Sequence, residues 1–251
     1  MQTRRGFVST VVAVLAASSV KALPFPSGVH DLLDEAAERL EAQSGGRLGL
    51  AILESESGTI HTWRGDERFL MASTFKALLA GAILRRVDQG QEDLGRAVDV
   101  RAEDLIEYAP AVEPMVGRSM TVAALCEATV TLSDNAAANI LLNTMGGPAG
   151  FTRILRELGD EVSRLDRYEP GLNQGAPGDL RDTTTPQAFL DTMTRLLLSD
   201  ALSPTSREQL LSWLVANQTG DDRIRAGVPE GWVVGDKTGT SGHGDVHDVA
   251  I

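Results

Sequence analysis

Hydrophobic positions along the chain predict a helical centre between strand-forming ends. Behind Ser73, and through much of 121–198, apolar residues recur three or four positions apart, the spacing of a helix face. Shorter apolar runs bounded by turn residues predict strands over 47–53, 59–64, 232–237 and 246–251. The predicted helices cover 29–43, 73–89, 121–131, 135–145, 149–158, 186–198 and 206–217.

This order of elements predicts an α+β fold. Strands near both ends of the chain imply an antiparallel sheet built from the two termini, with flanking helices and a helical lobe inserted between them. We expect an α/β domain formed by 23–65 and 218–251, and an all-α domain over 66–217. A long loop over 163–184, rich in Gly, Pro, Asn and Asp, interrupts the helices, and such loops are usually functional.

The first residues carry the pattern of an export leader. Arg4-Arg5 precedes an apolar run from Val8 to Val20, and a candidate cleavage site follows at Val20-Lys21-Ala22. We predict a twin-arginine signal peptide over 1–22 and a periplasmic or secreted product, with a lone N-terminal helix as the alternative. No uninterrupted apolar run reaches eighteen residues, so no stable membrane association is expected.

Charge and cysteine content narrow the possible partners. Without 1–22 the chain keeps 20 basic and 35 acidic residues, a formal charge of −15. An acidic surface argues against nucleic acid and anionic membranes as partners, so we expect a small-molecule ligand and, by default, a monomer.

The single cysteine, Cys126, is expected to be a packed thiol without a disulfide. His30 and His61 belong to no constellation and are expected at the surface.

Ser73 and Lys76 could form a nucleophile with an adjacent base. Three residues make nearly one helical turn, so the hydroxyl and the amine share a face. A partly desolvated lysine can accept the hydroxyl proton, and unpaired backbone N–H groups at a helix start can hold an oxyanion. Alone the signal is weak, because Ser18 and Lys21 repeat the spacing, and an N-cap beside a solvated lysine is the ordinary explanation.

Two tripeptides make the pattern specific. Ser133-Asp134-Asn135 lies at a helix junction and Lys237-Thr238-Gly239 at the end of a predicted strand, and either alone is ordinary. Together with Ser-x-x-Lys, in this order, they resemble the active-site signature of class A serine β-lactamases. The resemblance covers nearly the whole chain after residue 22. It includes Arg167–Asn173, which is similar to the family's Ω-loop motif, with Asp182 placed to pair with Arg167.

The resemblance implies a role for each matching residue. Ser73 would attack the lactam carbonyl, and Lys76, or Glu169 through a water, would take its proton. The backbone N–H groups of Ser73 and Thr240 would form the oxyanion hole. The implied catalytic residues are Ser73, Lys76, Ser133, Glu169, Asn173 and Lys237. The implied substrate-binding residues are Tyr108, Asn135, Arg223, Thr238, Gly239 and Thr240.

The implied function is hydrolysis of penicillins and cephalosporins through a serine acyl-enzyme, conferring β-lactam resistance without a metal or other cofactor. Glu169 and Asn173 can hold and deprotonate the water that releases the acyl group, and penicillin-binding peptidases resemble this feature poorly. The alternatives are a penicillin-binding peptidase, a slow β-lactam sensor or an inactive truncated β-lactamase. A zinc hydrolase is more distant, using His243, Asp245 and His247 on one face of a strand.

Two features depart from the family pattern. The pattern continues beyond Ile251 through another strand and a C-terminal helix, so we expect the printed sequence to be incomplete. The stretch Arg223–Pro229 and Thr240 are similar to the carbapenem-hydrolysing branch. That branch carries a pair of cysteines where Ala72 and Ser241 stand here, so the disulfide is absent and carbapenem activity is in doubt.

Overall fold

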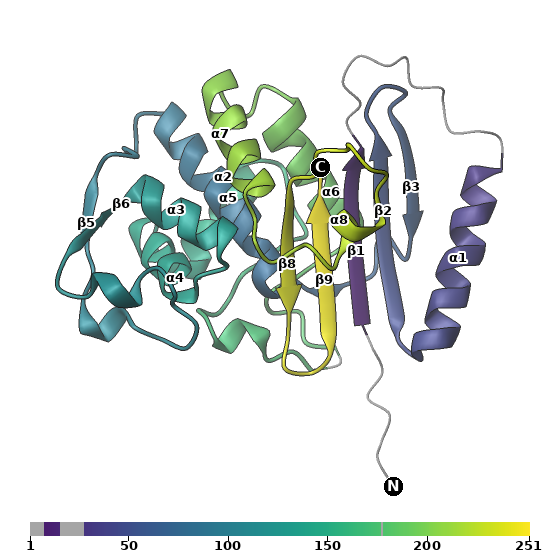
Figure 1. The fold of residues 1–251 in the computed structure, drawn as a ribbon, viewed down its shortest axis with the longest axis horizontal. Helices are drawn as coiled ribbons and strands as arrows, with labels where there is room; N and C mark the ends of the chain where they lie inside the picture. The colour runs from purple at the N-terminus through teal and green to yellow at the C-terminus, as the bar shows by residue number, and fades with distance from the viewer. Residues whose placement is uncertain (1–7, 16–27, 177) are drawn as a thin grey trace, which may run out of the picture.

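A five-stranded sheet at one end of the molecule packs beside a cluster of helices at the other (Figure 1). The computed structural model describes residues 8–15, 28–176 and 178–251. The strand order in the sheet is β3-β2-β1-β9-β8. These strands are β1 (Val8–Leu15), β2 (Arg47–Glu54), β3 (Thr59–Trp63), β8 (Asp236–Thr240) and β9 (Asp245–Ala250).

Two antiparallel hairpins from opposite ends of the chain form the sides of this sheet, as the sequence predicts. Strands β2 and β3 pair with Leu50 opposite Trp63, and β8 and β9 pair with Thr238 opposite Asp248. Between the hairpins, β1 runs parallel to both β2 and β9, so the complete sheet is mixed.

Strand β1 was not predicted. Its sequence lies inside the apolar run assigned to the export leader, and that run is also rich in valine, which favours strands. The twin-arginine pair Arg4-Arg5 and the cleavage candidate Val20-Lys21-Ala22 lie outside the described residues. Removal of residues 1–22 would take β1 out of the sheet and leave β2 and β9 as facing edges.

The last hairpin differs from its predicted boundaries. The strand expected over 232–237 begins only at Asp236 and continues to Thr240, so Lys237-Thr238-Gly239 lies inside β8 and not at its end. The predicted start was wrong because it rested on the apolar residues Trp232 and Val233. These are 51% and 75% exposed and belong to the preceding loop. The other predicted helices and strands match the observed ones to within about two residues.

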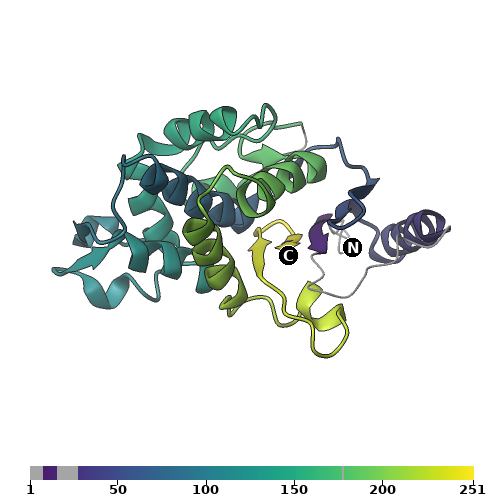
Figure 2. The same cartoon turned by 90° about the horizontal axis from the view of Figure 1, so that it is seen from above.

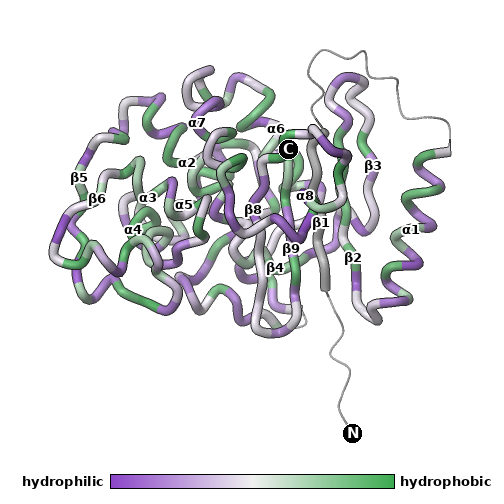
Figure 3. Tube along the Cα trace, in the orientation of Figure 1, coloured by the Kyte–Doolittle hydropathy of each residue, from purple (hydrophilic) through white to green (hydrophobic). Residues whose placement is uncertain are grey.

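The helical cluster is built around α2 (Phe75–Asp88). Every residue from Phe75 to Leu84 is buried, because neighbouring helices surround the first ten positions of α2. Five helices contact it: α3 (Val122–Thr131), α4 (Asn135–Thr144), α5 (Gly147–Glu157), α6 (Pro186–Leu198) and α7 (Pro204–Val215). The amphipathic helix α1 (Val29–Ser44), whose hydropathy alternates turn by turn in Figure 3, instead packs on β2 and β3.

Helix α6 packs against β1 and β2, and Figure 2 shows it on the opposite side of the sheet from the short α8 (Ile224–Gly227). Remaining short elements, none of them predicted, are β4 (Phe69–Leu70), η1 (Ala72–Thr74), β5 (Ala97–Asp99), η2 (Ala102–Asp104), η3 (Glu113–Met115), β6 (Ser119–Thr121), η4 (Gly171–Asn173) and β7 (Thr183–Thr184). Among the described residues, no helix combines the length and apolar character needed to cross a membrane.

Candidate active site

Ser73 lies in η1, the single 3-10 turn that leads directly into α2. The Lys76 amine donates a hydrogen bond of 3.0 Å to its hydroxyl oxygen. The hydroxyl in turn donates to Glu169 Oε1 at 3.4 Å. The preceding residue, Ala72, has a φ of 43°, a left-handed conformation that is unfavourable for alanine.

Lys76 is fully buried and surrounded by acceptors. Its Nζ lies 2.6 Å from Asn135 Oδ1, 2.8 Å from the Ser133 carbonyl oxygen and 3.3 Å from the Ser133 hydroxyl. It also lies 3.1 Å from Glu169 Oε1, and both side chains of this ion pair are inaccessible to solvent. Burial lowers the pKa of the Lys76 amine, while the Glu169 carboxylate opposes that shift. An amine in this setting can move a proton between the Ser73 and Ser133 hydroxyls.

Asp134 fixes the turn that carries Ser133 and Asn135. Its Oδ1 accepts from the backbone N–H of Ala137 at 2.9 Å and caps α4, as the sequence predicts. Its Oδ2 accepts from two further backbone N–H groups, those of residues 111 and 112, at 2.9 and 3.1 Å. Ser133 itself has a φ of 58°. One buried carboxylate therefore joins α4 to the loop opposite.

Glu169 is held by two asparagines. Asn173 Nδ2 donates to Glu169 Oε2 at 2.6 Å, so the predicted carboxylate and amide are adjacent. Asn139 was not predicted, yet its side chain spans the Glu169 backbone, accepting from the N–H and donating to the C=O at 3.0 Å each. Asn139 lies one turn after Asn135 on the same face of α4, and this spacing is the signal that could have found it.

The loop that carries Glu169 is pinned at its ends by Arg167 and Asp182. The predicted ion pair is present, with Nε of Arg167 2.5 Å from Oδ2 of the fully buried Asp182. Oδ1 of Asp182 accepts from the backbone N–H groups of Asp166 and Arg167 at 2.7 and 2.9 Å. Arg167 also donates to the Gln174 carbonyl at 2.9 Å, which closes the loop on itself.

Lys237 is the second buried lysine of the site. Its amine donates to the Thr238 carbonyl at 2.8 Å, and in the part of the chain that the structure describes no hydrogen bond joins it to Ser73 or Ser133. Burial, together with the nearby Lys76 cation, lowers the pKa of Lys237 to about 7. The family resemblance also implies a hydrogen bond from Lys237 to the Ser133 hydroxyl, and the described residues do not form it.

Strand β8 runs closely past the nucleophile turn at Gly239. A Cβ placed on Gly239 would lie 3.0 Å from the Met71 carbonyl oxygen and 3.1 Å from the Thr74 backbone nitrogen, so only glycine leaves room for this approach. The next residue, Thr240, accepts a hydrogen bond of 3.4 Å from Arg223 Nη2. Thr238 faces the same way along the strand, and its hydroxyl is 2.6 Å from that of Thr219.

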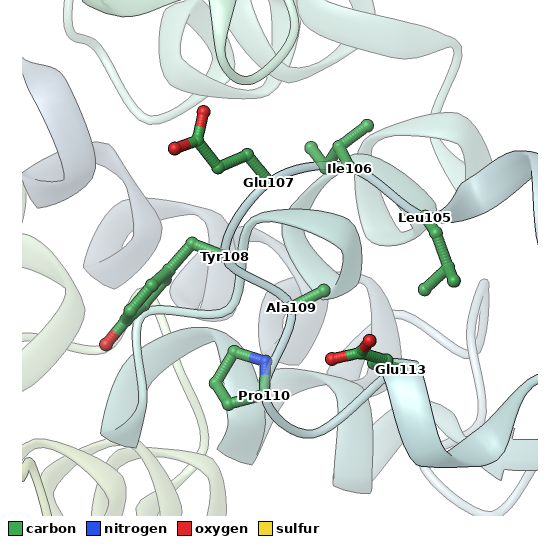
Figure 4. Close-up of a pocket in the computed structure, with 7 residues that line it drawn as sticks. All are labelled: Leu105, Ile106, Glu107, Tyr108, Ala109, Pro110 and Glu113. Carbon is green, nitrogen blue, oxygen red and sulfur yellow. The ribbon is translucent and has the colours of Figure 1, made fainter.

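Tyr108 lies on the loop between η2 and η3, beside the start of α4. The Asn135 N–H donates to the Tyr108 carbonyl at 3.0 Å, and Asn135 Nδ2 donates to the Glu107 carbonyl at 3.0 Å. The tyrosine side chain is 56% exposed. It lines an open pocket of about 580 Å³, and Figure 4 shows Tyr108 at one end of the lining residues and Leu105 at the other. The side chain is therefore available to contact a ligand.

The histidines do not form a metal site. Among the described residues no group of three or more His, Cys, Asp or Glu side chains could hold a metal ion. His247 is buried, which lowers the pKa of its imidazole to about 4, while Asp245 is hydrogen-bonded to Ser241. His243 precedes β9 and does not share its face. The zinc alternative thus lacks the ligand cluster that it requires.

Two predictions for single residues have opposite outcomes. Cys126 is fully buried, as expected, and burial raises the pKa of its thiol. The surface position expected for His61 is wrong, since its side chain is 5% exposed and its Nδ1 lies 2.8 Å from Nδ1 of His30. No local pattern predicts this contact, because it joins two elements that are distant in sequence, α1 and β3.

Comparison with known proteins places these residues in context. A family model described as the β-lactamase enzyme family matches residues 32–251, a range that includes every candidate site residue. The chain is 52% identical over 212 residues to β-lactamase FAR-1 of Nocardia farcinica (strain IFM 10152), covering 84% of this chain and 68% of that protein.

Solved structures of class A β-lactamases also superpose on this chain. An ancestral (GNCA) class A β-lactamase superposes with a TM-score of 0.86 at 61% identity, covering 87% of this chain and 84% of the other. The class A β-lactamase of the last common ancestor of Gram-negative bacteria (GNCA4) superposes with a TM-score of 0.85 at 59% identity, covering 87% and 83%.

Proposed function

This chain belongs to class A of the β-lactamase enzyme family and is a β-lactam hydrolase, and from that premise we propose that it acts on penicillins and cephalosporins through an acyl-enzyme on Ser73. One observation carries the proposal. The Ser73 hydroxyl oxygen lies 3.0 Å from the Lys76 amine and 3.4 Å from the Glu169 carboxylate, so a nucleophile has two proton acceptors in reach.

Acylation begins with attack of Ser73 Oγ on the lactam carbonyl carbon. Lys76, whose pKa is lowered by burial, or Glu169 through a water, takes the hydroxyl proton as the new ester bond forms. Backbone N–H groups of Ser73 and Thr240 stabilise the oxyanion, and the close passage of β8 at Gly239 supports this pairing. Each such donor contributes about 3 kcal/mol.

The lactam nitrogen leaves with a proton. The Ser133 hydroxyl is 3.3 Å from the Lys76 amine, so Ser133 can pass its proton to the departing nitrogen and be reprotonated from Lys76. Lys237 adds positive charge to this side of the site, where the substrate carboxylate binds together with Thr238, Thr240 and Arg223. Asn135 and Tyr108 flank the acylamino side chain.

Deacylation separates this enzyme from a penicillin-binding peptidase or a slow sensor. The Glu169 carboxylate and the Asn173 amide, 2.6 Å apart, together hold a water and remove its proton for attack on the ester. The ester bond breaks, the proton returns to Ser73 Oγ, and the penicilloate-type acid leaves. We therefore propose turnover and not trapping.

The substrate range and location follow from the same premise. We expect at most weak hydrolysis of carbapenems, because Ala72 and Ser241 replace the cysteine pair of the carbapenem-hydrolysing branch. We propose that the protein is exported by the twin-arginine route, acts as a monomer in the periplasm or outside the cell, and confers β-lactam resistance. N-terminal sequencing of the exported protein would test cleavage, since residues 8–15 also form β1.

Nitrocefin turnover by the purified chain tests the proposal. We expect turnover that EDTA does not reduce and that Ser73→Ala abolishes, while Ser57→Ala, at an exposed hairpin turn, keeps the rate of the parent protein. Intact-mass measurement after mixing should show a transient adduct on the parent protein. Loss of activity with EDTA, or full activity of Ser73→Ala, would overturn the serine mechanism.

A further inference from the structure

Arg223 lies in a segment that two buried carboxylates of the sheet hold in place. The segment 217–227 crosses β8 and β9 on the side away from α6 (Figure 2). Asp236 on β8 and Asp248 on β9 are 0% and 4% exposed, and both bind this segment. We propose that Asp248 is a positioning residue that holds Arg223 where its guanidinium can reach the substrate carboxylate. The inference rests on the proposed function.

Asp248 contacts the backbone immediately after Arg223. Its Oδ2 accepts from the Ile224 N–H at 3.0 Å. In the β8–β9 register Asp248 stands directly opposite Thr238, so its carboxyl lies on the face of the sheet that Thr238 and Thr240 share. This hydrogen bond ties the backbone next to Arg223 to β9, while the Arg223 guanidinium donates to the Thr240 hydroxyl on the neighbouring strand β8.

Asp236 provides the second attachment point. Its Oδ2 accepts from Asn217 Nδ2 at 2.6 Å, and its Oδ1 forms an ion pair with Arg225. A Cβ on Gly220 would lie 1.9 Å from Asp236 Oδ2, so only glycine lets the segment lie this close to the carboxylate. Asp236 therefore fixes both ends of the segment, while its middle, next to Arg223, depends on Asp248.

A buried carboxyl group at position 248 destabilises the folded protein unless it makes a contact that offsets its desolvation. Burial, and then the neighbouring Asp236 carboxyl, raise its pKa to about 7. Its Oδ1 is buried and has no hydrogen-bond partner among the described residues. A well-packed apolar side chain would avoid both costs but could not accept from Ile224. The contact with the Arg223 segment is the gain that an apolar residue cannot supply.

The test compares a benzylpenicillin-type substrate with its methyl ester, which lacks the carboxylate that Arg223 would bind. Asp248→Leu fills the position without an acceptor and should raise KM for the acid about 10-fold with kcat changed less than about threefold. Hydrolysis of the ester should stay unchanged. Asp248→Asn keeps an acceptor oxygen and should restore KM to within about threefold of the parent value.

A double variant tests whether Asp248 acts through Arg223. In an Arg223→Ala background, Asp248→Leu should add no further rise in KM, because the group it positions is gone. Asp222→Asn removes an exposed carboxylate beside Arg223 and should behave as the parent protein.

Three results would overturn the inference: equal losses on acid and ester, additive losses in the Arg223→Ala background, or an unchanged KM in Asp248→Leu. Failure of the proposed function would look different, since the parent protein would then form no Ser73 adduct with either substrate.

Discussion

The two walls of the active site are built on different principles. On the α2 and Ω-loop side, Ser73, Lys76 and Glu169 are already within 3.4 Å of one another, so their polar groups satisfy each other. On the β8 side, the Lys237 amine donates to the Thr238 carbonyl and to no other group among the described residues, and Arg223 reaches Thr240 at 3.4 Å. The reacting groups of the first wall contact one another directly, whereas Lys237 and Arg223 on the second wall can each donate to a further acceptor, such as a ligand carboxylate.

This contrast separates chemistry from binding. Groups that already contact the nucleophile can move its proton, and their loss should appear in kcat. Cations with few protein partners gain most from a ligand carboxylate, and their loss should appear in KM. Each of the following changes tests whether that division holds.

The largest effect is expected for Lys76→Ala on the α2 and Ω-loop wall. The change removes the base beside Ser73 and should lower kcat/KM by about 10²- to 10⁴-fold. It also leaves the buried Glu169 carboxylate unpaired, at a cost of about 3–5 kcal/mol in unfolding free energy. Urea unfolding and steady-state kinetics measure the two losses.

A paired variant separates those two losses. Lys76→Ala/Glu169→Gln removes both buried charges and should regain much of the stability but none of the activity. If Lys76→Ala kept the parent kcat, the assignment of chemistry to this wall would be wrong.

An intermediate effect is expected for Arg223→Ala on the β8 wall. Loss of a charged donor to the substrate carboxylate should raise KM by about 10- to 100-fold and leave kcat within about threefold. Arg118→Ala, which changes an exposed arginine just before β6, is the matched control. A fall in kcat without a rise in KM would assign Arg223 to the chemistry and erase the contrast.

The smallest effect on activity is expected for a change at Asp248, which lies beneath the β8 wall and whose ionisation lowers the unfolding free energy. The pKa of Asp248 is raised from 3.8 to about 7, so its ionisation opposes folding. The nearby Lys237 and Arg223 side chains favour its ionisation, whereas the Asp236 carboxyl disfavours it. The penalty is absent below pH 3.8, grows between pH 3.8 and 7, and reaches about 4 kcal/mol above that range.

Asp248→Asn removes this group, so the melting temperature of the variant minus that of the parent protein should increase by several degrees from pH 5 to pH 8. Differential scanning calorimetry at a series of pH values measures this difference. A difference that does not change with pH would contradict the raised pKa.

Much of the fold could be predicted because the signal is local. The helical spacing behind Ser73, the Asp134 cap, and Thr185 as a cap followed by a proline at the first helical position each predict a helix whose boundaries the structure reproduces. The strand boundary at 232–237 failed because apolar residues there are exposed, and sequence alone does not reveal which apolar residues find a packing partner.

Site residues could be predicted from the sequence only where they belong to a recognisable motif. The tripeptides and the Ω-loop named the residues that the structure brings to Ser73. Asn139 and Asp248 carry no motif, and their contacts, to Glu169 and Ile224, span 30 and 24 positions. Such contacts arise from tertiary packing, which periodicity does not encode. The left-handed backbone of Ala72, Tyr108 and Ser133 could not be predicted from the sequence either, because no local pattern favours it.

We propose that one wall carries out both acylation and release, with Glu169 activating the water for the second step. Time-resolved intact-mass measurement of Glu169→Ala mixed with a penicillin is the decisive experiment. We expect an adduct of the full substrate mass on Ser73 that persists, with product release slowed by about 10²- to 10⁴-fold. Release as fast as in the parent protein, with no adduct accumulating, would contradict it.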